Sequence, residues 1–453
     1  MAEPRLAEKQ NASAYGYFVA IFLSLVYTLN FLDRQIIATL APEIQTDLHL
    51  SNTQMGNLGG LYFALFYTFW GIPLAWLADR THRVRIVAFA CTLWSVFSMA
   101  CGIAQSYPAL VAARMGVGVG EAGGSPPSYS LLSDYFPPQR RSTALALYSL
   151  GVPFGTGLGA AIGVLVVTAY GWRTAFLVVG APGILMALLT LIFVREPKRG
   201  RFDPMPEGET ALPATQSLLS AVIAAIVSFL KSLGDFLSNR TLMLTGLSAG
   251  LSAFVGYAVV LWAPTILRKS LHMPPGDYAL YYSLASAITG AIGTFGSGWL
   301  ADRLSVINKA WYAWLPALVY VISIPFFIAF VCAGTWQLAM TFVIFPFLFN
   351  NMYLAPALAV VQNAVAPVKR AMSGALLLFI LNLIGLGGGP SFVGYVSDHV
   401  KPMYGFNPLQ IGMLALVPVT VIVIASHLAA AWSIGRDKTL ALTVQGIAEP
   451  LAL

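Results

Sequence analysis

A series of long apolar segments, separated by short polar stretches, constrains this chain more than any other feature of its sequence. Six segments cover residues 15–39, 54–78, 84–104, 107–133, 142–169 and 173–194, and six more cover 241–267, 278–301, 309–332, 336–365, 371–397 and 408–434. A helix of about 20 apolar residues spans a bilayer. Charged residues make up only 9% of the chain, too few for a water-facing surface, since soluble proteins hold roughly 25%. The sequence therefore predicts an all-α membrane protein with twelve transmembrane helices in two six-helix bundles.

The residue types that mark enzymes and cofactor sites are scattered along the chain. Three cysteines lie singly in apolar runs, five histidines show no zinc spacing, and no glycine-rich loop ends in the Gly-Lys-Ser or Gly-Lys-Thr of a nucleotide site. We therefore expect no metal, no cofactor and no enzymatic activity. The net charge of +7 is spread between the apolar segments, so nucleic acid is not an expected partner. The first segment is too long for a signal-peptide core and is expected to stay.

The positive residues predict how the chain is oriented in the membrane. With the amino terminus in the cytoplasm, nineteen of the 25 Lys and Arg residues fall in inner segments. The outer segments then hold only Arg173, Arg268, Lys269 and Lys401. Positive residues concentrate on the cytoplasmic side of membrane proteins, so both termini are predicted to be cytoplasmic. The bias continues through both halves, which requires an even number of crossings before residue 241.

The connector between the two groups, residues 195–240, contains one shorter apolar run. The run LLSAVIAAIVSFL is only about 13 residues long, which is short for a span. One helical face gathers the apolar residues Leu219, Val222, Ile223, Ile226, Leu230, Leu233 and Leu237. This pattern predicts an amphipathic helix on the cytoplasmic membrane surface, between bundles at 1–194 and 241–453. The alternative, a further span, would move every later positive loop outside.

A short motif occurs once in each half of the chain. The sequence LADR stands at 77–80, near the end of the second apolar segment, and at 300–303, near the end of the eighth. Glycine-rich stretches also recur at corresponding places, 151–163 and 385–394. Two related six-helix halves are typical of secondary transporters.

The charged residues of the repeated motif are Asp79, Arg80, Asp302 and Arg303. We expect them to pair with neighbouring helix ends and to gate the cytoplasmic side. The alternative is that they are solvated helix caps. Asp134 and Asp398, which end the fourth and eleventh segments, are either gate partners or caps.

Four ionisable residues fall inside predicted membrane segments. Asp33 and Arg34 lie in the first, and Arg114 and Glu121 in the fourth. Each costs roughly 2.5–3.5 kcal/mol to insert, so such residues are candidates for function. Arg114 and Glu121 are seven residues apart, two helical turns, and project from one face. We predict that Asp33 and Glu121 carry protons and that Arg34 and Arg114 bind an anion. The alternative is a purely structural cluster of ion pairs.

Several stretches resemble known transporters. The LADR loops resemble the signature loop of the major facilitator superfamily. Within it, FLDRQ at 31–35, the segment 114–141 and YGWRTAFLVVGAPG at 170–183 resemble the spinster family. That family has an Asp-Arg pair in its first helix, and an Arg followed by a glycine-rich Val-Gly-Glu-Ala segment in its fourth. The matching positions are Asp33, Arg34, Arg114, Gly118, Gly120 and Glu121. The resemblance implies a major facilitator fold and a carrier of sphingolipids or lysophospholipids.

The second half contrasts with the first, because its apolar segments contain no Asp, Glu, Lys or Arg away from their ends. The segment 341–358 is rich in Phe. We predict that Tyr257, Phe347 and Tyr353 contact the substrate as an apolar wall. The alternative is an ordinary packing or lipid-facing surface. His427, alone in the last segment, is expected to be a packed histidine, with a proton relay as the alternative.

These features together predict a proton-coupled secondary transporter that works by alternating access and moves an amphiphilic, lipid-like anion, such as a sphingoid phosphate or a lysophospholipid. Its partners would be that substrate, protons and the lipid bilayer, and we expect it to act as a monomer. Short loops are typical of a bacterial cell-membrane protein, and a lysosomal membrane is the alternative. Two other functions remain open: a small organic anion or drug transporter of the same fold, and a membrane enzyme or receptor.

Overall fold

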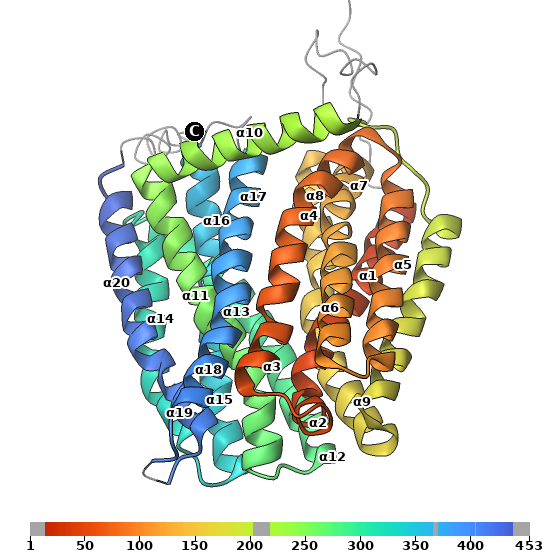
Figure 1. Cartoon of the computed structure of the whole chain (residues 1–453). Coiled ribbons are helices and arrows are strands. Elements are labelled where there is room, and N and C mark those ends of the chain that lie inside the picture. Colours follow the sequence, from red (N-terminus) through yellow and green to blue (C-terminus); the bar gives the residue numbers. More distant parts are fainter. Residues whose placement is uncertain (1–13, 203–217, 366–369, 404, 438–453) are drawn as a thin grey trace, which may run out of the picture.

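The predicted apolar segments are largely helical in the computed structural model, which describes residues 14–202, 218–365, 370–403 and 405–437. The helices form two groups, and α10 (Leu218–Ser238) lies across one end of both (Figure 1). The first group consists of α1 (Ala14–Thr39), α2 (Ala41–Asp47), α3 (Asn52–Gly59), α4 (Leu61–Arg80), α5 (Arg83–Ile103), α6 (Tyr107–Ala122), α7 (Ser125–Tyr135), α8 (Pro138–Ser149) and α9 (Gly151–Phe193). The second group consists of α11 (Arg240–Thr265), η1 (Ile266–Ser270), α12 (Pro275–Asp277), η2 (Tyr278–Tyr282), α13 (Ser283–Ser305), α14 (Trp311–Val331), α15 (Trp336–Asn350), α16 (Leu354–Asn363), α17 (Arg370–Ile380), η4 (Leu381–Leu386), α18 (Gly387–His399), α19 (Pro408–Leu414) and α20 (Leu416–Ile434).

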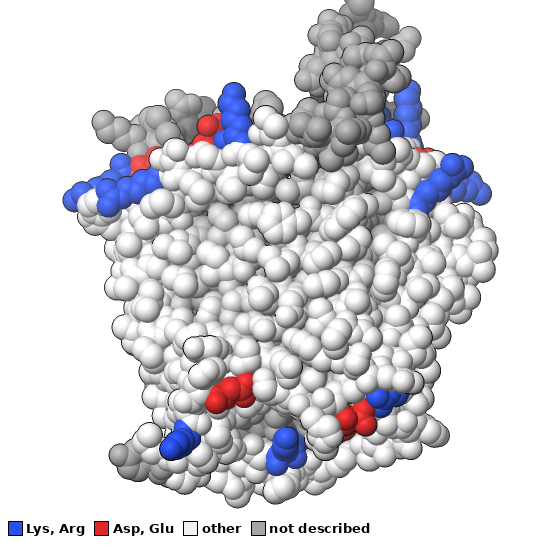
Figure 2. Space-filling model, viewed as in Figure 1, with Lys and Arg blue, Asp and Glu red and all other residues white. Residues whose placement is uncertain are grey.

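Different helices mark the two ends of the molecule. α10 crosses one end, whereas α2 and α12 lie at the other (Figure 1). We name these the α10 end and the α2 end. On the face shown in Figure 2, Lys, Arg, Asp and Glu gather near both ends and leave an uncharged belt between them. Such a belt suits the hydrocarbon core of a bilayer, where a charged side chain is costly.

Nine segments of the described chain are long and apolar enough to cross a membrane. One of them, Thr143–Phe193, runs through two predicted segments. It is interrupted at Gly171, whose φ of 82° lies in the left-handed region that glycine adopts most easily. The predicted segments at 107–133 and 278–301 are mostly helical, as α6–α7 and η2–α13, but are not among the nine. The structure is thus an all-helical, multi-span membrane protein.

The two groups meet closely near the α2 end, where α3 of the first packs against α18 of the second. A Cβ atom added to Gly56 of α3 would lie 3.0 Å from the Cα of Ser391. One added to Gly394 of α18 would lie 3.0 Å from the Cα of Thr53. Glycine allows two backbones to approach this closely. We name the contact of Gly56 and Gly394 with the opposite backbones the glycine seam.

Near the α10 end, aromatic rings join the two groups. Phe69 of α4 and Phe379 of α17 have ring centroids 6.0 Å apart, and Phe229 of α10 lies 5.0 Å from Phe379. Phe229 and Phe236 are buried, whereas Leu230 is 58% exposed. Of the apolar face that the sequence marks on α10, Ile226, Leu230 and Leu237 are exposed, whereas Leu233 packs against the protein. The phenylalanines beside that face dock the helix onto the two groups.

Candidate functional site

Four charged side chains of the first group meet inside the protein. Asp33 and Arg34 lie on α1, and Arg114 and Glu121 lie on α6. Asp33, Arg114 and Glu121 are 2%, 1% and 1% exposed, and the Arg34 side chain is 16% exposed. The structure thus brings together all four charges that the sequence places inside the membrane. We name these four residues the charged cluster.

The charged cluster consists of two ion pairs, each joining α1 to α6. The Nε of Arg34 donates to Oε2 of Glu121 at 2.5 Å. The Nη1 of Arg114 donates to Oδ2 of Asp33 at 3.5 Å. The four formal charges sum to zero, and each buried charge faces an opposite one. Removing a single partner would leave an uncompensated buried charge, which is strongly destabilising.

The two ion pairs differ in length. Arg34 and Glu121 form a direct charge-assisted hydrogen bond, whereas the Arg114–Asp33 distance exceeds the usual range. Asp33 has another partner, because the hydroxyl of Ser98 donates to its Oδ1. Among the described residues, the buried Nε of Arg114 and Oε1 of Glu121 have no hydrogen-bond partner. Arg114 thus keeps a donor, and Glu121 an acceptor, for further bonds.

Aromatic rings of α4 hold both arginines. The guanidinium carbon of Arg34 lies 5.1 Å from the ring centroid of Phe63 and 4.5 Å from that of Tyr67. The guanidinium carbon of Arg114 lies 5.1 Å from the same Phe63 ring. These distances lie within the cation–π range of about 6 Å. The sequence did not single out Phe63 or Tyr67, because aromatic residues four positions apart occur on any packed helix.

The three aromatic residues predicted for the second group lie in different surroundings. Tyr257 lies on α11, which packs across the boundary between the groups against α1, the helix that carries Arg34. Tyr353, just before α16, is buried in an apolar cluster of the second group against which Tyr257 packs. Phe347 of α15 packs instead against Tyr282 of η2, with ring centroids 5.5 Å apart. Tyr257 and Tyr353 therefore extend from the charged cluster into the second group, whereas Phe347 lies nearer the α2 end.

The second group contains a buried polar cluster that the sequence did not predict. The hydroxyl of Tyr320 on α14 donates to Oδ1 of Asn350 at 3.2 Å. His427 is buried, and its Nε2 is hydrogen-bonded to the Oγ of Ser252 at 2.8 Å, as expected for a packed histidine. These residues come from four different apolar segments, so no sequence spacing connects them.

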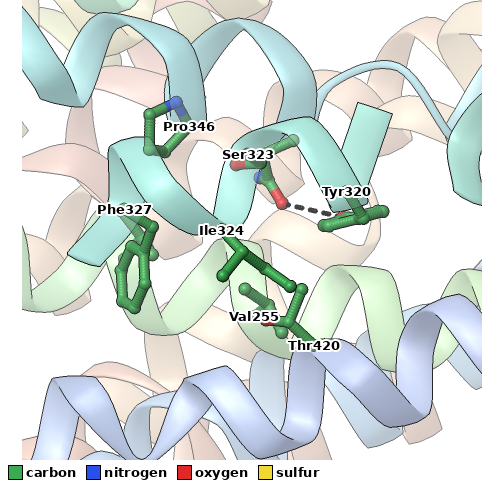
Figure 3. Close-up of a pocket in the computed structure, with 9 residues that line it drawn as sticks. Val255, Tyr320, Ser323, Ile324, Phe327, Pro346 and Thr420 are labelled. Carbon is green, nitrogen blue, oxygen red and sulfur yellow. Dashed lines mark hydrogen bonds between the residues drawn. The ribbon is translucent and has the colours of Figure 1, made fainter. Parts of the chain in front are cut away.

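A small cavity adjoins Tyr320, and Figure 3 shows the bond to Asn350 as a dashed line at its edge. The cavity volume of about 20 Å³ holds about one water molecule. That space is far too small for a lipid-like substrate. The lining residues are Val255, Val259, Tyr320, Ser323, Ile324, Phe327, Pro346, Asn350 and Thr420.

The described side chains of the LADR motifs contact their own groups in this conformation. Arg80 and Arg303 each lie over a nearby tryptophan ring, 4.3 and 4.2 Å from the ring centroids. The carboxylate of Asp302 accepts a hydrogen bond from the hydroxyl of Tyr312 at 3.2 Å. Asp79 belongs to α4, but its side chain lies outside the described part of the chain. The predicted gate residues therefore stay a hypothesis for another conformation.

A buried charge network at the same end centres on Arg83, which is 1% exposed. Its Nη1 donates to Oδ2 of Asp134 at 2.5 Å, and its Nε donates to Oε1 of Glu196 at 2.6 Å. Asp134, a candidate gate partner, thus pairs within the first group. Sequence reasoning missed the role of Arg83, because one arginine among several in a positive loop is indistinguishable from an orientation signal.

Comparison with known proteins identifies the family. A family model described as Major Facilitator Superfamily matches residues 23–390. An MFS-type efflux pump of Mycolicibacterium smegmatis is 31% identical over 395 residues, which cover 87% of this chain and 87% of the pump. The protein spinster of Drosophila melanogaster is 26% identical over 416 residues, which cover 88% of this chain and 64% of that protein.

Solved structures agree with the sequence comparisons. A crystal structure of a bacterial homolog of the human lysosomal transporter spinster, inward-facing and unoccupied, matches with a TM-score of 0.80 and 31% identity, covering 94% of this chain and 98% of that one. A nucleoside transporter with 13% identity has a TM-score of 0.68, a likeness of fold alone. The predicted resemblance to spinster proteins is thus confirmed, and the relatives are transporters rather than enzymes. The chain belongs to the major facilitator superfamily of secondary transporters.

Proposed function

We propose that this transporter moves an amphiphilic, lipid-like anion, of the sphingoid phosphate or lysophospholipid type, by alternating access coupled to protons. The charged cluster carries the proposal. It combines two arginines and two acids with a free donor on Arg114 and a free acceptor on Glu121 among the described residues. The similarity to spinster proteins supports a lipid-like substrate.

The proposal includes twelve crossings, with bundles at 1–194 and 241–453 and a cytoplasmic connector at 195–240. We assign the α10 end to the cytoplasm, because the loops at that end carry most of the Lys and Arg residues. The α2 end then faces the outside. The exposed Leu230 and Leu237 of α10 would insert into the cytoplasmic surface of the bilayer, which we take to be a bacterial cell membrane.

The headgroup would bind at Arg114 and Arg34. A phosphate or carboxylate oxygen accepts a charge-assisted hydrogen bond from a guanidinium, and such bonds are about twice as strong as neutral ones. The Nε of Arg114 is the donor without a partner among the described residues. Arg34 is held by Glu121 and would become available once that bond weakens.

The hydrocarbon chain would lie along the second group. Tyr257 lies on α11 beside α1 and packs with Tyr353 in the second group, and Phe347 would meet the chain nearer the α2 end. Burial contributes about 0.8 kcal/mol per CH₂ for a chain that arrives from water. The contribution is smaller for a chain that arrives from lipid, because it then leaves one apolar medium for another.

Proton coupling would act through the two acids of the charged cluster. A proton on Glu121 removes the charge that holds Arg34, and a proton on Asp33 removes the charge that faces Arg114. Each event frees an arginine for an anion and changes the ties between α1 and α6, which biases one conformation over the other. When the cytoplasmic side closes, ion pairs with neighbouring helix ends would form at the predicted gate residues Asp79, Arg80, Asp302 and Arg303.

Uptake into proteoliposomes tests this function. Labelled lysophospholipids and sphingoid phosphates are supplied with and without a pH gradient, and uptake should rise with the gradient. Glu121→Gln should abolish the effect of the gradient, whereas Asp277→Asn, a matched change on α12 away from the charged cluster, should not. Wild-type pH dependence in both Glu121→Gln and Asp33→Asn would place coupling elsewhere.

A second candidate is transport of small organic anions or drugs, which the 31% identity to an MFS-type efflux pump supports. The same liposomes discriminate the two candidates. Competition by drugs or short-chain anions, without any by lysolipids, would favour this second function.

A further inference from the structure

Among the described residues, charged side chains join the two groups at the α2 end. Asp398, at the end of α18, accepts two backbone hydrogen bonds from the first group. Its Oδ1 accepts from the N–H of Asn52 at 3.0 Å, and its Oδ2 from the N–H of Thr53 at 2.7 Å. Both N–H groups open helix α3, so one carboxylate of the second group caps a helix of the first.

The amino terminus of α3 explains why a carboxylate suits this position. The first N–H groups of a helix lack partners within the helix, and the helix dipole favours a negative charge there. Ser51 caps one of them, accepting from the N–H of Gln54 at 3.2 Å. Asp398 satisfies the two preceding N–H groups. The helix end is therefore completed only while the two groups are in contact.

A second polar contact lies at the same end. Arg268 of η1 donates to Glu43 of α2, with Nη2–Oε1 and Nη1–Oε2 distances of 2.5 and 3.2 Å. The Nη1 of Arg268 also donates to the backbone oxygen of Thr39 at 2.5 Å. The Arg268 side chain is only 10% exposed. This bidentate geometry fixes the orientation of the pair, unlike a loose surface ion pair.

We propose that Asp398 and Arg268 form an interdomain latch that sets the balance between the two conformations of the transport cycle. The inference rests on the alternating access of the proposed function. The latch is formed while the α2 end is closed, and both of its contacts must break before that end can open. Weakening either contact should therefore raise the population of molecules open at the α2 end, in the absence of any substrate.

The glycine seam lets the two groups approach closely beside the latch. At Gly56 and Gly394, the backbone of one helix lies directly against the backbone of the other. The polar bonds of Asp398 lie beside this seam. These bonds are directional, so a rigid-body separation of the two groups would break them.

Distance measurements between spin labels test the latch. In a Cys332→Ser background, spin labels are placed on Gln105→Cys and Lys401→Cys. Both positions are exposed, and each lies on a different group. The distance between the labels reports the separation of the groups at the α2 end. The wild type should show mainly the short distance. Asp398→Asn should add a longer population, Asp398→Ala a larger one, and Arg268→Gln a comparable one.

The matched control is Asp47→Asn. Asp47 also pairs with an arginine near the α2 end, but its partner Arg173 belongs to the same group, so the distances should stay as in the wild type. Unchanged distances in folded Asp398→Ala and Arg268→Gln proteins would overturn the latch, as would an equal shift in Asp47→Asn. If Asp398 variants fail to fold, Arg268→Gln decides alone.

The measurement also separates this inference from the proposed substrate. It uses neither lipid substrate nor a pH gradient. A longer population with no lysolipid transport would leave the latch standing and reject the substrate. Lysolipid transport with unchanged distances would support the substrate and overturn the latch.

Discussion

At the scale of single residues, Arg114 allows the most direct test of the binding site. Arg114→Ala removes the guanidinium whose Nε is unpartnered among the described residues. A hydrogen bond to a charged group contributes about 1.5–3 kcal/mol, and 1.4 kcal/mol is about tenfold in affinity. We expect anionic lysolipids to bind roughly ten- to a hundredfold more weakly, whatever their chain length. Titration of a homologous series measures this.

The control for Arg114→Ala is the double variant with Asp33→Asn, which removes the acid that would otherwise stay buried without its arginine. It should fold better than the single variant and bind anions equally weakly. Phe347→Ala should change the preference for chain length and keep the preference for an anionic headgroup. Normal anion binding by the double variant would rule out the headgroup assignment.

Ser252 tests the buried polar cluster of the second group. Ser252→Ala removes the hydroxyl bonded to Nε2 of His427. A buried polar group left without its partner costs about 1–3 kcal/mol, so the melting temperature in detergent should fall. Ser426→Ala is the matched control, because its hydroxyl bonds only the backbone of its own helix among the contacts described, at Val423. Equal losses in both variants would contradict the assigned role.

The ion pair of Asp47 with Arg173 should contribute to stability in a pH-dependent way. The hydrogen bond from Arg173 is the largest influence on its carboxyl and lowers the pKa of Asp47 below the ordinary value. The ionised form therefore stabilises the fold above the usual Asp pKa of about 3.9, and the contribution is lost as the pH falls through the lowered pKa. Asp47→Asn should melt slightly below the wild type at pH 7, since exposed pairs contribute little. The gap should close in acid, and a constant gap from pH 3 to 7 would contradict this assignment.

The sequence identifies charged residues that lie inside apolar segments. It does not identify residues whose role depends on their neighbours in the fold. Asp33 and Glu121 could be predicted because a charge inside an apolar segment is costly. Phe63 could not, because an aromatic residue is ordinary in a membrane helix and only the fold sets it against two arginines. Arg83 and Asp398 sit at segment ends, where charges are common, so their partners became visible only in three dimensions.

At the scale of elements, α10 is the helix whose attachment can be tested. Phe229 and Phe236 are buried, whereas Leu230 is exposed. Phe229→Ala with Phe236→Ala should release the helix and speed hydrogen exchange of its backbone amides, because the docked rings hold it. Leu230→Ala should leave exchange nearly unchanged in detergent. Similar exchange in both variants would mean that lipid or detergent, rather than the two groups, holds α10.

The sequence predicts where the helices lie better than it predicts which face of each helix packs against protein. Length and apolar character predicted helices in all twelve windows, and helical periodicity predicted α10. Periodicity could not tell which apolar face meets protein and which meets lipid, because both are apolar. For the same reason Phe347 was grouped with Tyr353, although it packs against Tyr282.

At the scale of the whole molecule, the orientation can be measured directly. Lys231 on α10 and Lys269 on η1 are both exposed and lie near opposite ends. In a Cys332→Ser background, Lys231→Cys should react with a membrane-impermeant thiol reagent only from the cytoplasm, and Lys269→Cys only from outside. The buried Cys91 and Cys101 should stay silent. Labelling with the opposite sidedness would invert the topology.

The glycine seam has a consequence for how often the molecule can change shape. Ordering a long side chain on closure loses rotamer freedom worth up to about 2 kcal/mol, whereas glycine has no rotamers to lose. Backbones that meet at Gly56 and Gly394 therefore close without this entropic loss. Closing the α2 end therefore costs less than it would with long side chains at the seam, which favours a repeated return to the closed form.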